Sequence, residues 1–227
     1  MISKYLDNYL SNICGFKCFI INSKKKIKIF LKIKSKFLLV LKTNEKINLS
    51  DFKGYKVTVK SKLIQFKKKI QIEKKPKFYC RAVKYKDKNK LLKICRENLY
   101  SSRFENDKNL SKTFLRSYRA IWIKNFFLKK RGDYLFVAYD KKKIYGFILL
   151  IKEQRNLRID QILVGNNFKR LGVAKTLINF TSNQFFGKFK FIVAGTYNHN
   201  LVAKKMYKSL DFVKQKKITN VFHLYPK

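Results

Sequence analysis

Residues 159–174 read IDQILVGNNFKRLGVA, and this stretch decides how the chain is interpreted. Its first six residues are mostly aliphatic, which predicts a buried strand, and the polar residues after them predict a loop. A helix is expected to begin near Gly172. The first turn of a helix has free backbone N–H groups, and Lys169 and Arg170 add positive charge, so the unit suits a bound phosphate. An ordinary strand-to-helix turn with basic side chains would have the same pattern.

A second informative stretch follows at residues 200–212, which read NLVAKKMYKSLDF. Asn200, Ala203 and Tyr207 are spaced three and four apart, so a helix would place them on one face. At 1.5 Å per residue, Asn200 and Tyr207 would lie about 10 Å apart along that face. The small alanine between them leaves room for a narrow ligand.

The two stretches together resemble the GNAT superfamily of N-acetyltransferases. Residues 169–174 are similar to the family's cofactor loop, Gln/Arg-x-x-Gly-x-Gly/Ala, with Lys169 at the first position. Residues 200–212 are similar to its Asn-x-x-Ala…Tyr-x-x-x-Gly-Phe segment, with Asp211 where glycine is usual. The resemblance implies an α/β fold with a GNAT-like mixed central sheet flanked by helices. It also implies acetyl-CoA as co-substrate and no metal.

The resemblance assigns roles to individual residues. The loop amides would hold the pyrophosphate of acetyl-CoA, and a splayed strand end would offer backbone groups to the acetyl carbonyl and the pantetheine amides. The cofactor-binding residues implied are Ile162, Leu163, Val164, Lys169, Arg170, Leu171, Gly172, Val173, Ala174 and Asn200. Tyr207 would be the catalytic residue, since a hydroxyl with a pKa of about 10 can protonate a departing thiolate. Packing against the sheet is the alternative role for Tyr207.

Other segments resemble the dTDP-fucosamine acetyltransferases within that superfamily. They are Ser102-Arg103-Phe104 with Asp107, residues 122–125 (WIKN), residues 10–17 (LSNICGFK), Gly195-Thr196 and residues 221–224 (VFHL). The resemblance implies N-acetylation of a dTDP-linked 4-amino-4,6-dideoxy sugar for cell-surface polysaccharide biosynthesis. Arg103 and Trp122 would be the substrate-binding residues. Arg103 could equally cap the helix that precedes it.

The composition of the 227 residues allows a large folded core, since 46% are hydrophobic and 15% aromatic. Lys and Arg number 55 against 13 Asp and Glu, a formal net charge of +42. This charge suggests nucleic acid, but it is spread evenly along the chain and is mostly lysine, as an A/T-rich coding sequence would produce. We therefore expect no specific nucleic-acid partner. Two alternatives stay open: a protein or peptide N-acetyltransferase, and a non-enzymatic nucleic-acid-binding protein.

The pattern predicts two domains, a small β-rich domain over residues 1–75 and an acetyltransferase domain over residues 76–227. Strands are expected at residues 27–33, 37–41, 55–60, 63–70, 78–83, 134–139, 144–151, 157–164, 189–194, 212–215 and 220–224. Helices are expected at residues 87–99, 111–130, 172–186 and 200–210.

The remaining reactive residues have ordinary interpretations. His199 and His223 are expected to be loop and strand histidines and not bases, since no orienting carboxylate is apparent for either. Asp160 could accept a proton through water, but a salt bridge with a lysine is the favoured role. The four cysteines lack zinc-site spacing and are expected to be buried thiols. No apolar run is long enough to cross a membrane, so we expect a cytoplasmic protein without membrane insertion. Whether the protein forms a homodimer stays open.

Overall fold

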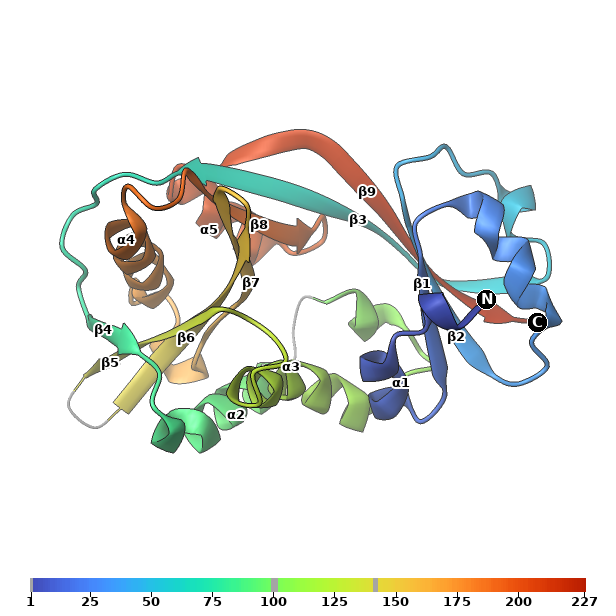
Figure 1. The fold of residues 1–227 in the computed structure, drawn as a ribbon, viewed down its shortest axis with the longest axis horizontal. Helices are drawn as coiled ribbons and strands as arrows, with labels where there is room; N and C mark the ends of the chain where they lie inside the picture. The colour runs from blue at the N-terminus through green and yellow to red at the C-terminus, as the bar shows by residue number, and fades with distance from the viewer. Residues whose placement is uncertain (1, 99–101, 141–142) are drawn as a thin grey trace.

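A nine-stranded mixed sheet runs through the whole molecule (Figure 1). The computed structural model describes residues 2–98, 102–140 and 143–227. The strands lie in the order β1-β2-β9-β3-β8-β7-β6-β5-β4, and helices cover the sheet on both faces. The predicted fold class, a GNAT-like mixed sheet flanked by helices, is confirmed.

The strands are β1 (Lys17–Ile21), β2 (Phe37–Thr43), β3 (Tyr55–Lys69), β4 (Tyr79–Ala82), β5 (Tyr134–Asp140), β6 (Lys143–Glu153), β7 (Asn156–Val164), β8 (Phe191–Tyr197) and β9 (Val213–Pro226). The pairs β1–β2 and β7–β8 are parallel, and the other neighbouring pairs are antiparallel.

Two long strands, β3 and β9, join the N-terminal and C-terminal parts of the chain. They pair with each other along most of their length and cross the molecule as one ribbon, as Figure 1 shows. The sequence predicted two shorter strands in each of these regions. Because the last strand of the chain lies between β2 and β3, residues 1–75 and 76–227 share one sheet. The proposed division into two domains at residue 75 stays a prediction.

The helices are α1 (Asn8–Cys14), α2 (Lys88–Glu97), α3 (Lys112–Phe127), α4 (Val173–Phe185) and α5 (Leu201–Ser209). One face of the sheet packs against α4 and α5 around residues such as Leu177 and Tyr207. The opposite face packs against α2 and α3, with α1 further along. The four predicted helices are confirmed with shifted ends. Leu99, placed on the face of the first of them, lies outside the described residues.

The predicted strand at residues 27–33 is wrong. These residues lie in and just after a 3₁₀ helix, η2 (Lys24–Lys32). Ile27 and Phe30 are buried and three residues apart, which is one 3₁₀ turn, whereas Ile29 and Leu31 are nearly half exposed. The alternation of isoleucine and lysine therefore did not reflect a buried strand face. None of the helices among the described residues is both long and apolar enough to cross a membrane.

Candidate active site

The strands β7 and β8 separate in the middle of the sheet. They pair in parallel only where Asn156–Ile159 lie beside Phe191–Ala194. Beyond that point β7 continues to Val164 along β6, while β8 continues to Tyr197 along β3. The backbone groups of Ile162, Leu163 and Val164 that face β8 therefore have no ladder partner there. The splayed strand end that the resemblance implied is present.

The loop after β7 leaves the backbone amides at the start of α4 accessible. Gly172 is the residue before the helix and has φ of +88°, in the left-handed region that favours glycine. A side chain added there would meet nothing within 4 Å, so the space in front of the helix is open. The N–H of Thr176 donates to the Gly172 carbonyl (2.9 Å), and the amides before Thr176 have no carbonyl one turn back.

Gly146 on β6 lets this loop sit close to the sheet. A Cβ at this position would lie 2.6 Å from the Leu163 carbonyl oxygen and 3.1 Å from a methyl group of Val173. Only glycine therefore allows β6, the end of β7 and the start of α4 to approach this closely. Lys169, Arg170 and Leu171 are exposed next to the opening, and Val173 and Ala174 form the first turn.

The second predicted segment, residues 200–212, contains the whole of α5, which follows β8. The Asn200 side-chain oxygen accepts a hydrogen bond from the Ala203 amide (3.0 Å) and caps the helix. Tyr207 is buried, and its ring centroid lies 5.4 Å from that of Phe66 and 5.1 Å from that of Phe212. No described residue forms a hydrogen bond with its hydroxyl. Burial raises the pKa of Tyr207, so the hydroxyl keeps its proton at neutral pH.

Arg103 lies on the opposite face of the sheet, in η5 (Arg103–Asn106), and its donors point to protein acceptors. Its Nε donates to His223 Nε2 (3.0 Å) and its Nη1 donates to the Tyr197 hydroxyl (2.8 Å). His223 Nδ1 lies 2.6 Å from Asp107 Oδ2. His223 is a strand histidine, as predicted, but the expectation that no carboxylate orients it is wrong.

Burial fixes the protonation of this histidine. Desolvation lowers the pKa of His223 to about 4, against the opposing effect of the Asp107 hydrogen bond. Burial alone would raise the pKa of Asp107, but hydrogen bonds from His223, the Asn109 amide and Tyr225 outweigh it and lower that pKa. At neutral pH the pair is thus a carboxylate and a neutral imidazole. Since Nε2 accepts from Arg103, the proton is on Nδ1 and is donated to Asp107.

Trp122 lies on α3 beside a cluster of ionic groups. The guanidinium of Arg131 stacks over its ring at 4.2 Å and donates twice to Asp160, at 2.6 and 2.7 Å. Arg158 also donates to Asp160 (3.1 Å). The predicted salt bridge of Asp160 is confirmed, but its partners are arginines and not a lysine. The Trp122 Nε1 and both polar atoms of the Gln161 side chain are buried without a partner in the described part of the chain.

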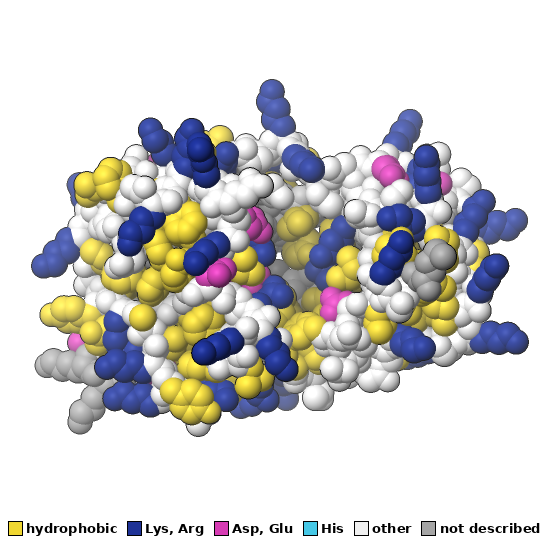
Figure 2. Space-filling model, in the orientation of Figure 1, with side chains coloured by type: hydrophobic (Ala, Val, Ile, Leu, Met, Phe, Trp, Pro, Cys, Tyr) yellow, Lys and Arg dark blue, Asp and Glu magenta, His cyan; other side chains and the backbone are white. Residues whose placement is uncertain are grey.

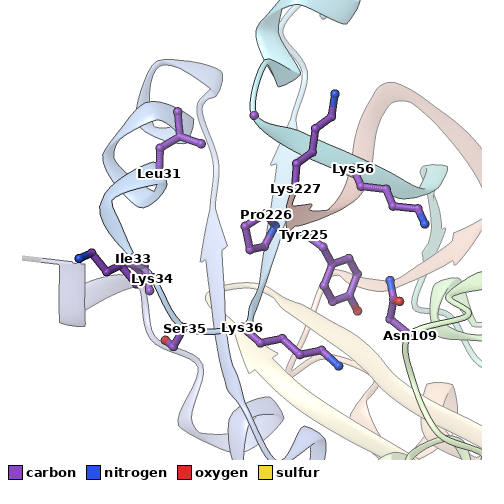
Figure 3. Close-up of a pocket in the computed structure, with 11 residues that line it drawn as sticks. Leu31, Ile33, Lys34, Ser35, Lys36, Lys56, Asn109, Tyr225, Pro226 and Lys227 are labelled. Carbon is purple, nitrogen blue, oxygen red and sulfur yellow. The ribbon is translucent and has the colours of Figure 1, made fainter.

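Two surface pockets open elsewhere on the sheet and its helices, and Tyr225 and Asn109, which bond to Asp107, line the first of them. The larger, with a volume of about 550 Å³, is ringed by Lys34, Lys36, Lys56 and Lys227 (Figure 3). It opens at the start of β3, whereas β8 pairs with the end of that strand. The other, of about 470 Å³, lies between α1 and α3. Within the ranges that the structure describes, no group of His, Cys, Asp or Glu is arranged to hold a metal, and all four cysteines are free.

A family model described as the acetyltransferase (GNAT) domain matches residues 100–224. The chain belongs to this family. Members use acetyl-CoA as the acetyl donor, and the open amides of α4 beside the splayed end of β7 fit its pyrophosphate and pantetheine groups. The protein is therefore an acetyltransferase with acetyl-CoA as co-substrate.

Solved structures of low sequence identity share the fold. A conserved protein of unknown function from Staphylococcus epidermidis has a TM-score of 0.63 at 14% identity, covering 92% of this chain and 83% of its own. A putative GNAT acetyltransferase from Novosphingobium aromaticivorans has a TM-score of 0.59 at 11% identity, covering 90% and 81%. A GCN5-related N-acetyltransferase from Kribbella flavida has a TM-score of 0.54 at 8% identity, covering 92% and 81%. No curated protein matches the sequence.

Proposed function

We propose that this protein is a cytoplasmic N-acetyltransferase that transfers the acetyl group of acetyl-CoA to the 4-amine of a dTDP-linked 4-amino-4,6-dideoxy sugar, for cell-surface polysaccharide biosynthesis. The observation that carries the proposal is the separation of β7 from β8, with α4 and α5 beginning at the same edge. Family membership supports acetyl transfer, and the substrate class rests on the resemblance of the segments around Arg103 and Trp122.

The donor side uses residues from the middle of the chain. The amides of Gly172, Val173 and Ala174 would bind the pyrophosphate, with the exposed cations of Lys169 and Arg170 beside them. The free backbone groups of Ile162, Leu163 and Val164 would bind the pantetheine amides and the acetyl carbonyl. Exposed Leu171 would pack against the donor, and Asn200 has an amide group left after its oxygen caps α5.

The reaction would be direct transfer. The neutral amine attacks the thioester carbonyl carbon, the carbon–sulfur bond breaks, and the proton lost by the nitrogen passes to solvent. Tyr207 gives its hydroxyl proton to the departing sulfur and regains a proton from water. One feature supports this role: the hydroxyl forms no hydrogen bond with a described residue, so its proton is available to a ligand.

Acceptor competition tests the proposal. The purified protein would be offered acetyl-CoA with a dTDP-4-amino-4,6-dideoxyhexose, a dipeptide amine and an aminoglycoside, and release of free thiol would be measured. The amino sugar should give the highest kcat/KM. Preferential acetylation of the dipeptide would instead favour a protein or peptide N-acetyltransferase and would leave the donor site and Tyr207 in their proposed roles.

A further inference from the structure

Lys42 and Arg103 bring two positive charges together on one face of the sheet. Val40 of β2 pairs with His223 of β9, and Lys42 lies two residues further on the same face. On that face His223 accepts the hydrogen bond from Arg103. Figure 2 shows a hollow in the middle of the molecule, and in the same orientation the ribbon of β3 and β9 passes above this point (Figure 1).

The guanidinium of Arg103 is held in a fixed direction. Asp107 binds His223, His223 accepts from Nε of Arg103, and Tyr197 accepts from its Nη1. The Tyr225 hydroxyl also donates to Asp107 (3.0 Å). An arginine has five N–H groups, so three remain for a ligand after these two bonds. A guanidinium held in this way can bind a phosphate with little further loss of side-chain freedom.

The amine of Lys42 forms no ion pair with a described residue. Its side chain is half-buried, and among the described residues no carboxylate lies within ion-pair distance of its Nζ. Burial first, and the charge of Arg103 second, lower the pKa of Lys42 to about 8. Asp7 acts in the opposite direction, while Arg131 and Arg158 add to the repulsion. Both of those arginines already bind the carboxylate of Asp160.

Two neighbouring cations without an anion between them cost free energy in the unliganded protein. We propose that Lys42 and Arg103 form a subsite for a diphosphate group of the acceptor, with Asp107 and His223 as positioning residues for Arg103. This inference rests on the proposed function, in which the dTDP moiety supplies the diphosphate. The subsite is separate from the proposed donor site, since α4 packs on the opposite face of the sheet from Arg103.

Calorimetric titration with two probes, dTDP and inorganic pyrophosphate, tests the subsite. Saturating coenzyme A would be present to block the donor site. Lys42→Met keeps the length of the side chain and removes its charge, and Arg103→Gln removes the guanidinium. Each should weaken binding of both probes at least tenfold while leaving the affinity for coenzyme A unchanged. Unchanged affinity in both variants would overturn the proposal.

Matched controls separate this effect from a general loss of positive charge. Lys60→Met removes an exposed lysine from β3, and Arg116→Gln removes an exposed arginine from α3. Both should bind pyrophosphate within twofold of the wild type. If they weaken binding as strongly as Lys42→Met does, the probes bind the basic surface and the proposal fails.

The positioning role of His223 has its own readout. His223→Gln can still accept from Arg103 and donate to Asp107, whereas His223→Ala can do neither. We expect a raised KM for the acceptor in the alanine variant, recovery toward the wild-type KM in the glutamine variant, and no change in the KM for acetyl-CoA. Equal KM values in the wild type and the folded alanine variant would contradict this role. If the alanine variant does not fold, Tyr197→Phe takes its place, because it removes the hydroxyl that accepts a hydrogen bond from Arg103. A raised KM for the amino sugar in that variant would support the positioning of Arg103, and an unchanged KM would contradict it.

Failure of the subsite and failure of the proposed function give different results. If pyrophosphate binding depends on Lys42 and Arg103 but dTDP amino sugars are not acetylated, the subsite stands and the acceptor is another phosphorylated amine. If the amino sugar is acetylated with the same KM by the wild type and Lys42→Met, the function stands and the subsite is wrong.

Discussion

Replacement of Lys42 by methionine should stabilise the unliganded protein. A lysine that has a pKa of 10.5 when unperturbed and about 8 in the folded chain is less easily charged after folding. The pKa difference, 10.5 − 8, is about 2.5. At 1.36 kcal/mol per pKa unit, the charge of Lys42 lowers the free energy of unfolding by at most about 3 kcal/mol at pH 7. Because the side chain is only partly buried and can move, we expect a gain of about 1–2 kcal/mol, or a Tm higher by about 3–6 °C.

The pH dependence gives the sign of this effect. The unfolded chain binds more protons at Lys42 than the folded chain between pH 8 and 10.5, so the wild type regains stability as the pH rises through that window. The difference in Tm between Lys42→Met and the wild type should therefore shrink from pH 7 to pH 10. Calorimetry of both proteins, with Lys60→Met as the control, measures it. A lower Tm for Lys42→Met at pH 7 would refute the reasoning, since it would mean that the amine is stabilised by a protein partner.

Four further outcomes are expected. Gly172→Glu should abolish the rise in Tm caused by acetyl-CoA, because it adds a negative side chain at a left-handed residue in front of the α4 amides; calorimetry with the ligand checks this. Tyr207→Phe should lower kcat by about 10²-fold with unchanged acetyl-CoA affinity, and an unchanged kcat would leave packing as its only role. The pKa of His223 is lower in the folded chain than when unperturbed, so the wild type should lose stability as the pH falls from 6.5 to 4, and His223→Gln should lose less in urea titrations. A fragment of residues 76–227 should fail to fold cooperatively by circular dichroism, because it lacks β3 between β8 and β9; a stable fragment would support independent domains.

The local structure of the proposed donor side could be predicted because its residues are consecutive in sequence. The strand, loop and helix around Gly172 are consecutive, and aliphatic periodicity with glycine and basic residues gives their order without tertiary information. The same holds for Asn200, since an asparagine before a helical pattern is a common N-cap and here accepts from Ala203. The residue pattern by itself could not show that β7 parts from β8, which only the resemblance implied, because β7 and β8 leave each other to pair with β6 and β3.

The side-chain network of the proposed acceptor side could not be predicted because its residues are distant in sequence. Asp107 and His223 are 116 residues apart, and no spacing rule connects them. The pattern around Val221 predicted a strand, but a buried histidine needs a partner that only the folded sheet identifies. Lys42 looked like one of many surface lysines. The strand predicted at residues 27–33 was wrong because a two-residue period in a short lysine-rich segment does not determine which side chains are buried.

The proposed acceptor subsite draws on two parts of the chain, and this division bears on specificity. The donor loop, α4, α5 and Arg103 all lie within residues 100–224, the part that matches the family. Lys42 lies outside that part, on a strand that reaches the site only because β9 pairs with β2 on one side and β3 on the other. The donor is the same molecule throughout the family, so a shared domain can bind it. An acceptor-specific charge is better placed on an added segment, which can change without disturbing the donor loop.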